Sequence, residues 1–168
     1  CGPVSSDMKT QSPLIHRYDV ESAMDMYERA TSMFPAVDAG ILCAAVADFT
    51  PETTADEKIK RKGDDMVIRL KPTQDIAASL GQMKTEAQIL VGFALETNDE
   101  KNNAQLKLKK KNLDFIVLNS LNDEGAGFRC DTNKITIISV DDEKDFPLKS
   151  KAEVAKDIVD ELENHIKA

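Results

Sequence analysis

Two short basic segments carry the side chains of this sequence best suited to chemistry on a phosphorylated ligand. One spans residues 58–62 and the other spans residues 107–111. They stand out because the chain has a formal net charge of -8, so a phosphate group needs a local basic patch. Charge-assisted bonds to phosphate contribute about 1.5–3 kcal/mol each where water is partly excluded. A solvated charge run is the competing interpretation, and it is favoured for Lys60, Arg61 and Lys62 taken singly.

Lys107 and Lys111 are four residues apart within a segment predicted to be helical, so both stems lie on one helix face. Their mutual repulsion costs only about 0.2–0.5 kcal/mol, which a phosphate between them readily outweighs. The pair therefore fits a phosphate clamp, whereas Lys109 and Lys110 point toward solvent. Composition alone leaves the pair as an ordinary polar face.

Asp48 and Phe93 each follow or end an apolar run of strand length. Ligands of open α/β sheets bind at the carboxyl ends of the strands, where a carboxylate can accept hydrogen bonds from a ribose or an exocyclic amine. An aromatic ring there can pack against a base. The competing interpretations are that Asp48 caps the loop before Pro51 and that Phe93 belongs to the core.

The elements that must position these residues alternate along the chain. Apolar periodicity predicts a helix over 19–34 with Asp19 as N-cap, and further helices over 75–84 and 99–111. Continuous apolar runs predict buried parallel strands over 40–46, 88–95 and 115–118. We therefore expect an α/β fold, a Rossmann-like three-layer sandwich with a mostly parallel sheet.

Two stretches interrupt this alternation. Residues 50–75 are expected to form a flap and interface extension, in which Met66–Leu70 alternates like a half-exposed antiparallel strand. Residues 122–133 predict a long turn before a strand over 134–140. The last helix opens with a capping box of Ser150 and Glu153, and its spacing predicts four buried residues: Val154, Ile158, Leu162 and Ile166.

Composition excludes several classes of function. The acidic charge argues against general affinity for nucleic acid or anionic membranes, and no apolar run approaches the length of a membrane span. Three cysteines without zinc-like spacing favour a reducing cytoplasm, and Cys43 is expected to be buried in a strand and not nucleophilic. His16 and His165 are the only histidines, too few for a multi-histidine metal site. Neither the Walker A nor the Gly-x-Gly-x-x-Gly fingerprint occurs.

Four segments together resemble phosphopantothenoylcysteine synthetase, the ligase domain of bacterial coenzyme A biosynthesis. They are Ala44-Ala45-Val46-Ala47-Asp48-Phe49, the basic segment at Lys58, Gly92-Phe93-Ala94-Leu95-Glu96-Thr97, and the run from Lys107 to Asp114. The resemblance implies a nucleotide site, with Lys58 as its catalytic lysine, at the following positions: Ala44, Ala45, Asp48, Lys58, Pro72, Thr73, Gln74, Phe93, Lys107 and Lys111. Gln74 stands where the family often has proline, which leaves backbone contacts from that turn intact.

The family joins 4'-phosphopantothenate to L-cysteine, and its bacterial members typically use CTP and Mg²⁺. The resemblance implies an acyl-cytidylate intermediate, a homodimer that forms through residues 50–75, and in many relatives a fused flavin-dependent decarboxylase domain. It also implies an upstream strand, a glycine-rich segment and an Asn-x-Ser-Ser-Gly motif, none of which occurs in residues 1–168. Two alternatives follow: a nucleotide-binding module without turnover, and an interaction domain whose lysine helix binds an acidic protein.

Overall fold

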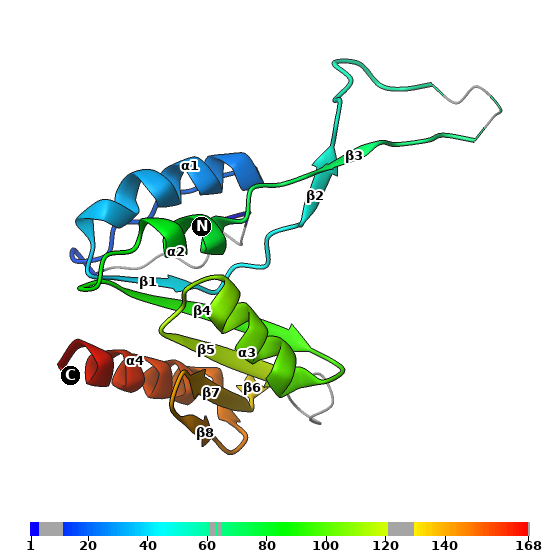
Figure 1. Cartoon of the computed structure of the whole chain (residues 1–168). Coiled ribbons are helices and arrows are strands. Elements are labelled where there is room, and N and C mark those ends of the chain that lie inside the picture. The colour runs from blue at the N-terminus through cyan, green and yellow to red at the C-terminus, as the bar shows by residue number, and fades with distance from the viewer. Residues whose placement is uncertain (4–11, 61–62, 64, 121–129, 168) are drawn as a thin grey trace. The chain divides into compact units, whose positions relative to one another are not determined.

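The computed structural model describes residues 1–3, 12–60, 63, 65–120 and 130–167. The chain divides into two compact units. The first, here called the N-terminal unit, comprises Cys1–Arg29 and Ala44–Asp75; the second, the sheet unit, comprises Ala30–Cys43 and Ile76–Ala168. Figure 1 shows the helices and strands of both.

The sheet unit is built on five strands in the order β1-β4-β5-β7-β8. Their bounds are Ala39–Leu42, Ile89–Glu96, Phe115–Ser120, Ile135–Ser139 and Glu143–Asp145. β1, β4 and β5 pair in parallel, β7 is antiparallel to β5, and β8 is antiparallel to β7. Four strands therefore run in one direction, and β7 alone runs against them. This confirms the prediction of a mostly parallel α/β sheet.

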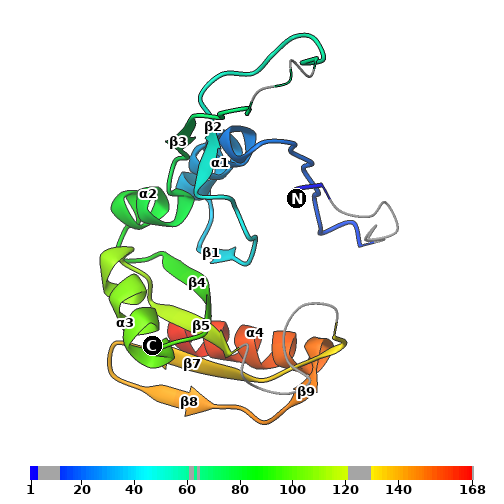
Figure 2. The ribbon, with the colours of Figure 1, turned by 90° about the vertical axis from the view of Figure 1, so that its right-hand side faces the viewer.

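Helices cover both faces of this sheet, which makes three layers (Figure 2). On one face, Leu80 of α2 (Ile76–Met83) and Ala104 and Leu108 of α3 (Glu100–Lys110) pack in a core cluster with Leu90 of β4. On the other face, Val154 and Ile158 of α4 (Lys151–Lys167) pack against Val91. Alternate residues of β4 thus face opposite helices, as expected for a strand whose apolar run is continuous.

The first helix, α1, begins later than predicted. It spans Ala23–Met33 and is followed by a 3-10 turn over Phe34–Ala36. Ser22 Oγ accepts from Asp25 N at 3.1 Å while Asp25 Oδ2 accepts from Ser22 N at 2.9 Å, so this pair caps the helix. These bonds lower the pKa of Asp25. Asp19 as N-cap was wrong, since its carboxylate instead pairs with Arg17 at 2.6 Å.

The last helix follows its prediction over most of its length. Ser150 N donates to Glu153 Oε2 at 3.0 Å and Glu153 N to Ser150 Oγ at 3.3 Å, which confirms the capping box. Val154 and Ile158 are buried, and Leu162 packs against the same cluster. Ile166 is 58% exposed, so its predicted burial was wrong. The apolar spacing of the helix continues to Ile166, but this side chain remains exposed and does not pack on the sheet.

The strand predicted over 40–46 is shorter in the structure, because β1 ends at Leu42. Cys43 is therefore outside the strand and exposed, which corrects the prediction of a buried position. Partial desolvation nevertheless raises the pKa of its thiol, which disfavours the nucleophilic thiolate.

In the N-terminal unit, β2 (Phe49–Pro51) pairs antiparallel with β3 (Leu70–Pro72). The antiparallel strand expected over Met66–Leu70 thus begins only at Leu70. Met66, Val67 and Ile68 are exposed, and they precede the paired residues.

A second short ribbon, in the sheet unit, consists of β6 (Thr132–Asn133) and β9 (Lys149–Ser150). The strand predicted over 134–140 is confirmed by β7. Most of the turn expected over 122–133 lies outside the described residues.

Candidate functional site

Two of the predicted nucleotide-binding segments meet within the N-terminal unit. Thr73 N donates to the backbone oxygen of Asp48 at 2.9 Å, and Thr73 Oγ1 donates to that of Ala47 at 2.7 Å. These bonds continue the pairing of β2 with β3 and fix residues 72–74 beside the end of the 44–48 segment. Ala44, Ala45 and the Asp48 side chain are exposed, so this junction presents both backbone groups and a carboxylate to solvent.

Lys58 lies in the segment that joins β2 to β3. It is exposed and belongs to neither a helix nor a strand, and the same holds for Lys60. Glu52 N donates to Arg69 O at 2.9 Å just beyond the ribbon, which ties the two ends of the segment together. Arg61 and Lys62 lie outside the described residues. Lys58 therefore lies on a loop whose two ends are joined by the β2–β3 pairing and by the bond from Glu52 to Arg69.

Lys107 lies in the last turn of α3, and Lys111 is the C-cap residue directly after it. Lys111 N donates to Lys107 O at 3.0 Å, so the helix geometry that relates the two stems is intact. Leu108 beside them is buried, whereas Lys107, Lys109 and Lys110 are exposed and Lys111 is half-buried. Exposure does not separate the two pairs, so their placement on different helix faces stays a prediction.

The Lys107 ammonium already has an anionic partner in the sheet unit. Its Nζ lies 2.6 Å from Oε1 of Glu96, the last residue of β4. The Lys107 side chain is 45% exposed, and that of Glu96 is 15% exposed. A polyphosphate at Lys107 would therefore approach a lysine that is held from one side and open on the other.

The end of α3 is anchored by residues that sequence reasoning did not single out. Asn112, at φ +50°, donates from Nδ2 to Gly81 O at 2.8 Å. A Cβ on Gly81 would lie 1.9 Å from the backbone oxygen of Lys111, so only glycine permits this approach of α2 to α3. The signals were a glycine inside a helical pattern and an asparagine after it, both typical of close packing and of helix ends.

Asp114 completes this anchor. Lys84 Nζ donates to both Asp114 carboxylate oxygens at 2.8 Å, and Leu90 N donates to Asp114 Oδ2 at 2.6 Å. The carboxylate thus joins the end of α2 to β4 directly after the lysine helix. Its role is to position α3, because its hydrogen-bonding capacity is occupied within the fold.

Phe93 is half-buried and packs against the cluster on the α4 face, with Phe115 and Val117. Lys107 extends from α3, which covers the opposite face. The structure therefore does not bring Phe93 and Lys107 to the same face of the sheet. The ring has the core packing that the competing interpretation gave it, and its contact with a base stays a prediction.

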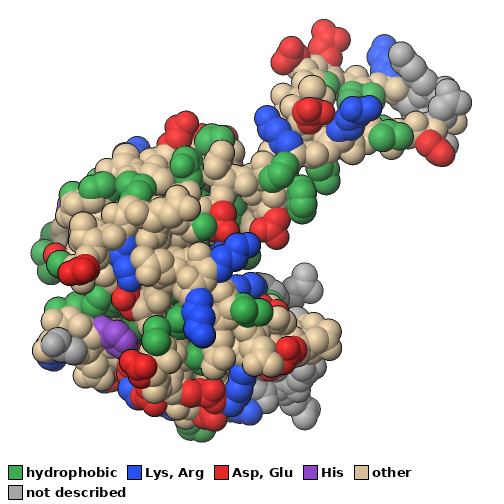
Figure 3. Space-filling view, in the orientation of Figure 1, with side chains coloured by type: hydrophobic (Ala, Val, Ile, Leu, Met, Phe, Trp, Pro, Cys, Tyr) green, Lys and Arg blue, Asp and Glu red, His purple; other side chains and the backbone are tan. Residues whose placement is uncertain are grey.

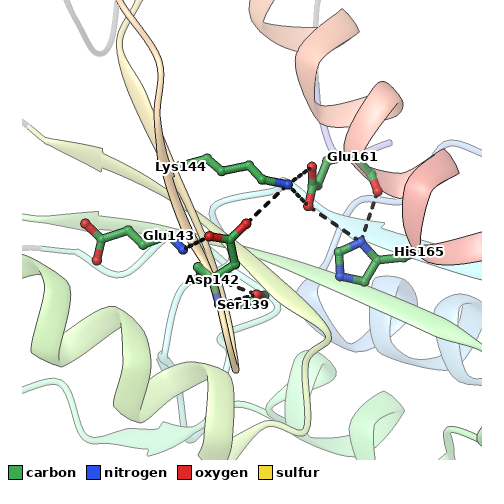
Figure 4. A network of polar contacts seen from close by, with 6 residues as sticks. All are labelled: Ser139, Asp142, Glu143, Lys144, Glu161 and His165. Carbon is green, nitrogen blue, oxygen red and sulfur yellow. Dashed lines mark hydrogen bonds and ion pairs between the residues drawn. The ribbon is translucent and has the colours of Figure 1, made fainter. Parts of the chain in front are cut away.

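A polar network at α4 is drawn in Figure 4, and α4 packs on the face of the sheet where Phe93 lies. Lys144 Nζ donates to both Glu161 carboxylate oxygens at 2.9 and 2.8 Å and lies 3.4 Å from Asp142 Oδ2. The bond to Glu161 raises the pKa of Lys144. His165 Nδ1 lies 3.0 Å from Glu161 O, and its ring stacks 5.0 Å from Phe115. These contacts join α4 to β8 and the core, so we interpret the network as structural.

Metal and membrane features were searched in the described part of the chain. No group of three or more histidine, cysteine, aspartate or glutamate side chains that could hold a metal ion is found there. Among the same residues no helix is both long and apolar enough to cross a bilayer.

Three similar proteins place the chain among known sequences and folds. A cysteine/cysteine sulfinic acid decarboxylase of an unknown prokaryotic organism is 57% identical over 94% of this chain and 44% of its own length. The coenzyme A biosynthesis bifunctional protein CoaBC of Bacillus subtilis is 46% identical over 96% of this chain and 39% of its own length. The crystal structure of a CoaBC C-terminal domain is 32% identical, with a TM-score of 0.78, and the match covers 99% of this chain and 72% of that one.

The chain thus spans about two fifths of the length of these curated relatives. The solved domain confirms the fold expected from the resemblance to phosphopantothenoylcysteine synthetase. The family model described as the DNA/pantothenate metabolism flavoprotein C-terminal domain matches residues 1–166, and the chain belongs to this family.

Proposed function

We propose that this chain is the phosphopantothenate–cysteine ligase part of a coenzyme A biosynthesis protein, and that it uses CTP. The observation that carries the proposal is the match of the family over 1–166, together with 46% identity to a bifunctional coenzyme A biosynthesis protein. Lys107 and Lys111 on one helix turn, and Lys58 on a separate loop, supply the positive charge that a polyphosphate needs on an acidic chain.

The proposed reaction has two steps. A carboxylate oxygen of 4'-phosphopantothenate attacks the α-phosphorus of CTP, which forms the acyl-cytidylate and releases pyrophosphate. The amine of L-cysteine then attacks the acyl carbon, the bond to CMP breaks, and the amine loses a proton. Both steps need neutralisation of phosphate charge and an in-line approach of the reacting atoms.

The residues of this chain have separate roles in this scheme. In the sheet unit, Lys107 and Lys111 bind the polyphosphate, and in the N-terminal unit Lys58 is the catalytic lysine that stabilises the charge developing at the α-phosphorus. The Asp48 carboxylate accepts hydrogen bonds from the ribose or the base, beside backbone groups of Ala44, Ala45 and the 72–74 turn. Mg²⁺ would be held by the phosphates of CTP and would neutralise part of their charge, as is usual for this ion.

We also propose that the chain dimerises through residues 50–75 and works in the cytoplasm. Several large apolar side chains are exposed on this extension, and exposed apolar groups of this kind mark interaction sites. They are Ile59, Met66, Val67, Ile68 and Leu70. Green side chains are visible along the extension in Figure 3. Relatives more than twice as long leave room for a fused flavin-dependent decarboxylase domain.

A ligation assay tests the proposal. The protein is incubated with 4'-phosphopantothenate, L-cysteine and Mg²⁺, with either CTP or ATP, and pyrophosphate and the amide product are quantified. We expect both products with CTP and much less with ATP. Calorimetric binding of CTP without product would identify a nucleotide-binding module instead, and equal weak binding of all nucleotides would favour an interaction domain.

A further inference from the structure

Glu96 occupies a position that links the sheet to the lysine helix. It is the last residue of β4 and is paired in register with Ser120 of β5. Residues of β4 with the same parity, Leu90 and Ala94, face the core cluster under α3. The Glu96 side chain therefore points toward α3, and at 15% exposure it is largely enclosed.

Glu96 contacts Lys107 through a single carboxylate oxygen. Oε1 lies 2.6 Å from Lys107 Nζ, a short charge-assisted hydrogen bond. An ammonium group has three donors, so this bond fixes the nitrogen and leaves further donors for a second anion. The helix stem beneath Lys107 is itself fixed, because Ala104 and Leu108 are buried against the sheet.

The loop between Glu96 and α3 is also braced. Asn102 Nδ2 donates to Asp99 Oδ1 at 2.6 Å, and Asn103 Nδ2 donates to Asn98 O at 2.9 Å. Both asparagines belong to the first turn of α3, so they tie the loop to the helix that carries Lys107. The distance between the carboxylate and the ammonium is thereby set by packed elements at both ends.

We propose that Glu96 is a positioning residue for polyphosphate binding, which acts by holding the Lys107 ammonium at the carboxyl end of β4. The inference rests on the proposed function. A free lysine side chain loses much rotamer freedom on binding a phosphate, and Glu96 removes most of that freedom in advance. A carboxylate beside a polyphosphate is by itself repulsive, so its benefit must pass through Lys107.

A double-mutant cycle tests this dependence. Isothermal titration calorimetry on the full-length protein measures the binding of CTP and of inorganic triphosphate to four proteins. They are wild type, Glu96→Gln, Lys107→Ala and the double variant. We expect Glu96→Gln to weaken binding of both probes about five- to tenfold in the wild-type background. In the Lys107→Ala background the same change should leave binding unchanged or tighten it, because only the repulsion is then removed.

Two further variants separate positioning from structure. Glu96→Asp keeps the charge and should recover part of the lost affinity. Glu163→Gln is the matched control, since it removes a carboxylate from an exposed pair with Lys167 on α4, and it should change affinity less than twofold. Melting temperatures of all variants should stay within a few degrees of wild type, as expected for a partly exposed pair.

Each remaining result has a defined meaning. Equal weakening by Glu96→Gln in both backgrounds would show that Glu96 acts without Lys107, and tighter binding in the wild-type background would make it a competitor of phosphate. Either result overturns the inference. Wild type that binds neither probe would remove the proposed function. NMR of ¹⁵N-labelled lysine side chains measures the mobility of Lys107 Nζ directly. Equal mobility in wild type and in Glu96→Gln would overturn the positioning role of Glu96 and would leave the proposed function unaffected.

Discussion

Two lysine–glutamate pairs lie on opposite faces of the same sheet, and they differ in what surrounds them. Lys144 donates to both oxygens of Glu161 and also lies near Asp142, so its ammonium has two carboxylate partners. Lys107 contacts one oxygen of Glu96 at the carboxyl end of β4. The two lysine side chains are almost equally exposed, so the comparison rests on the number of contacts: Lys144 has three carboxylate oxygens within 3.4 Å and joins a helix to a strand, whereas Lys107 has one and keeps donors for a phosphate.

The largest effect is expected from changing Lys107 and Lys111 together to Ala. If both lysines bind the same polyphosphate, CTP affinity should fall at least about a hundredfold, because two charge-assisted contacts are lost. Cytidine affinity should change little, since no charged group of cytidine reaches the helix. The free energy of unfolding should shift by about 1 kcal/mol at most, because loss of the partly exposed pair with Glu96 is offset by the helix propensity of alanine. Calorimetry and thermal denaturation measure both quantities.

Changing Lys109 and Lys110 together to Ala is the matched control. It removes the same charge from exposed positions of the same helix. Comparable losses of CTP affinity in the two double variants would mean that general electrostatics is responsible, and the clamp would have to be abandoned.

The other pair should respond in stability instead of binding. Glu161→Gln removes the carboxylate through which α4 binds Lys144 of β8, and we expect a loss of about 1–3 kcal/mol in the free energy of unfolding. CTP affinity should be unchanged, since the network lies on the face opposite α3. Urea denaturation and calorimetry report the two outcomes. Glu163→Gln in an exposed pair of the same helix should cost less than about 0.5 kcal/mol, and an equal cost would show that burial of Glu161 is irrelevant.

Lys58 provides an intermediate case, because it lies outside the helices and strands and no ion pair joins it to another described residue. Lys58→Gln should slow acyl-cytidylate formation about tenfold while the melting temperature stays constant, since an exposed loop lysine contributes little to the core. Single-turnover measurement of pyrophosphate release detects the step. Lys60→Gln in the same segment is the control, and a matching decrease there would leave Lys58 without a specific role.

The sequence predicted the sheet unit well because its strands are buried on both faces. β4 and β5 are continuous apolar runs, and α3 has its predicted bounds to within a residue at each end. The short ribbon of β2 and β3 escaped because its residues are largely exposed, so no buried face imposes a pattern on them. Ile166 failed for the converse reason, since helical periodicity continues past the end of the covering sheet.

The candidate site was predictable as residue types but not as contacts. The four-residue spacing of Lys107 and Lys111 is local, and helix geometry preserves it. The bond between Lys107 and Glu96 joins a helix to a strand end, and only the packing of α3 on the sheet creates it. The approach of Gly81 to Lys111 O is likewise tertiary. A resemblance between motifs therefore located the lysines, while the residues that orient them required the fold.

The smallest effect concerns the pH dependence of the α4 network. The hydrogen bond from Lys144 to Glu161 raises the pKa of Lys144 above the ordinary value of 10.5. The folded state therefore binds the ammonium proton of Lys144 more tightly than the unfolded state does. The resulting stabilisation is fully present below the unfolded pKa and is lost as the pH rises through the folded pKa. Because Lys144 is partly exposed, solvent screening keeps the contribution small. Urea denaturation between pH 9 and pH 11.5 should therefore show a slightly steeper alkaline loss of stability in wild type than in Lys144→Met. Parallel curves would mean that the pair of Lys144 with Glu161 adds nothing and that packing alone holds α4 on the sheet.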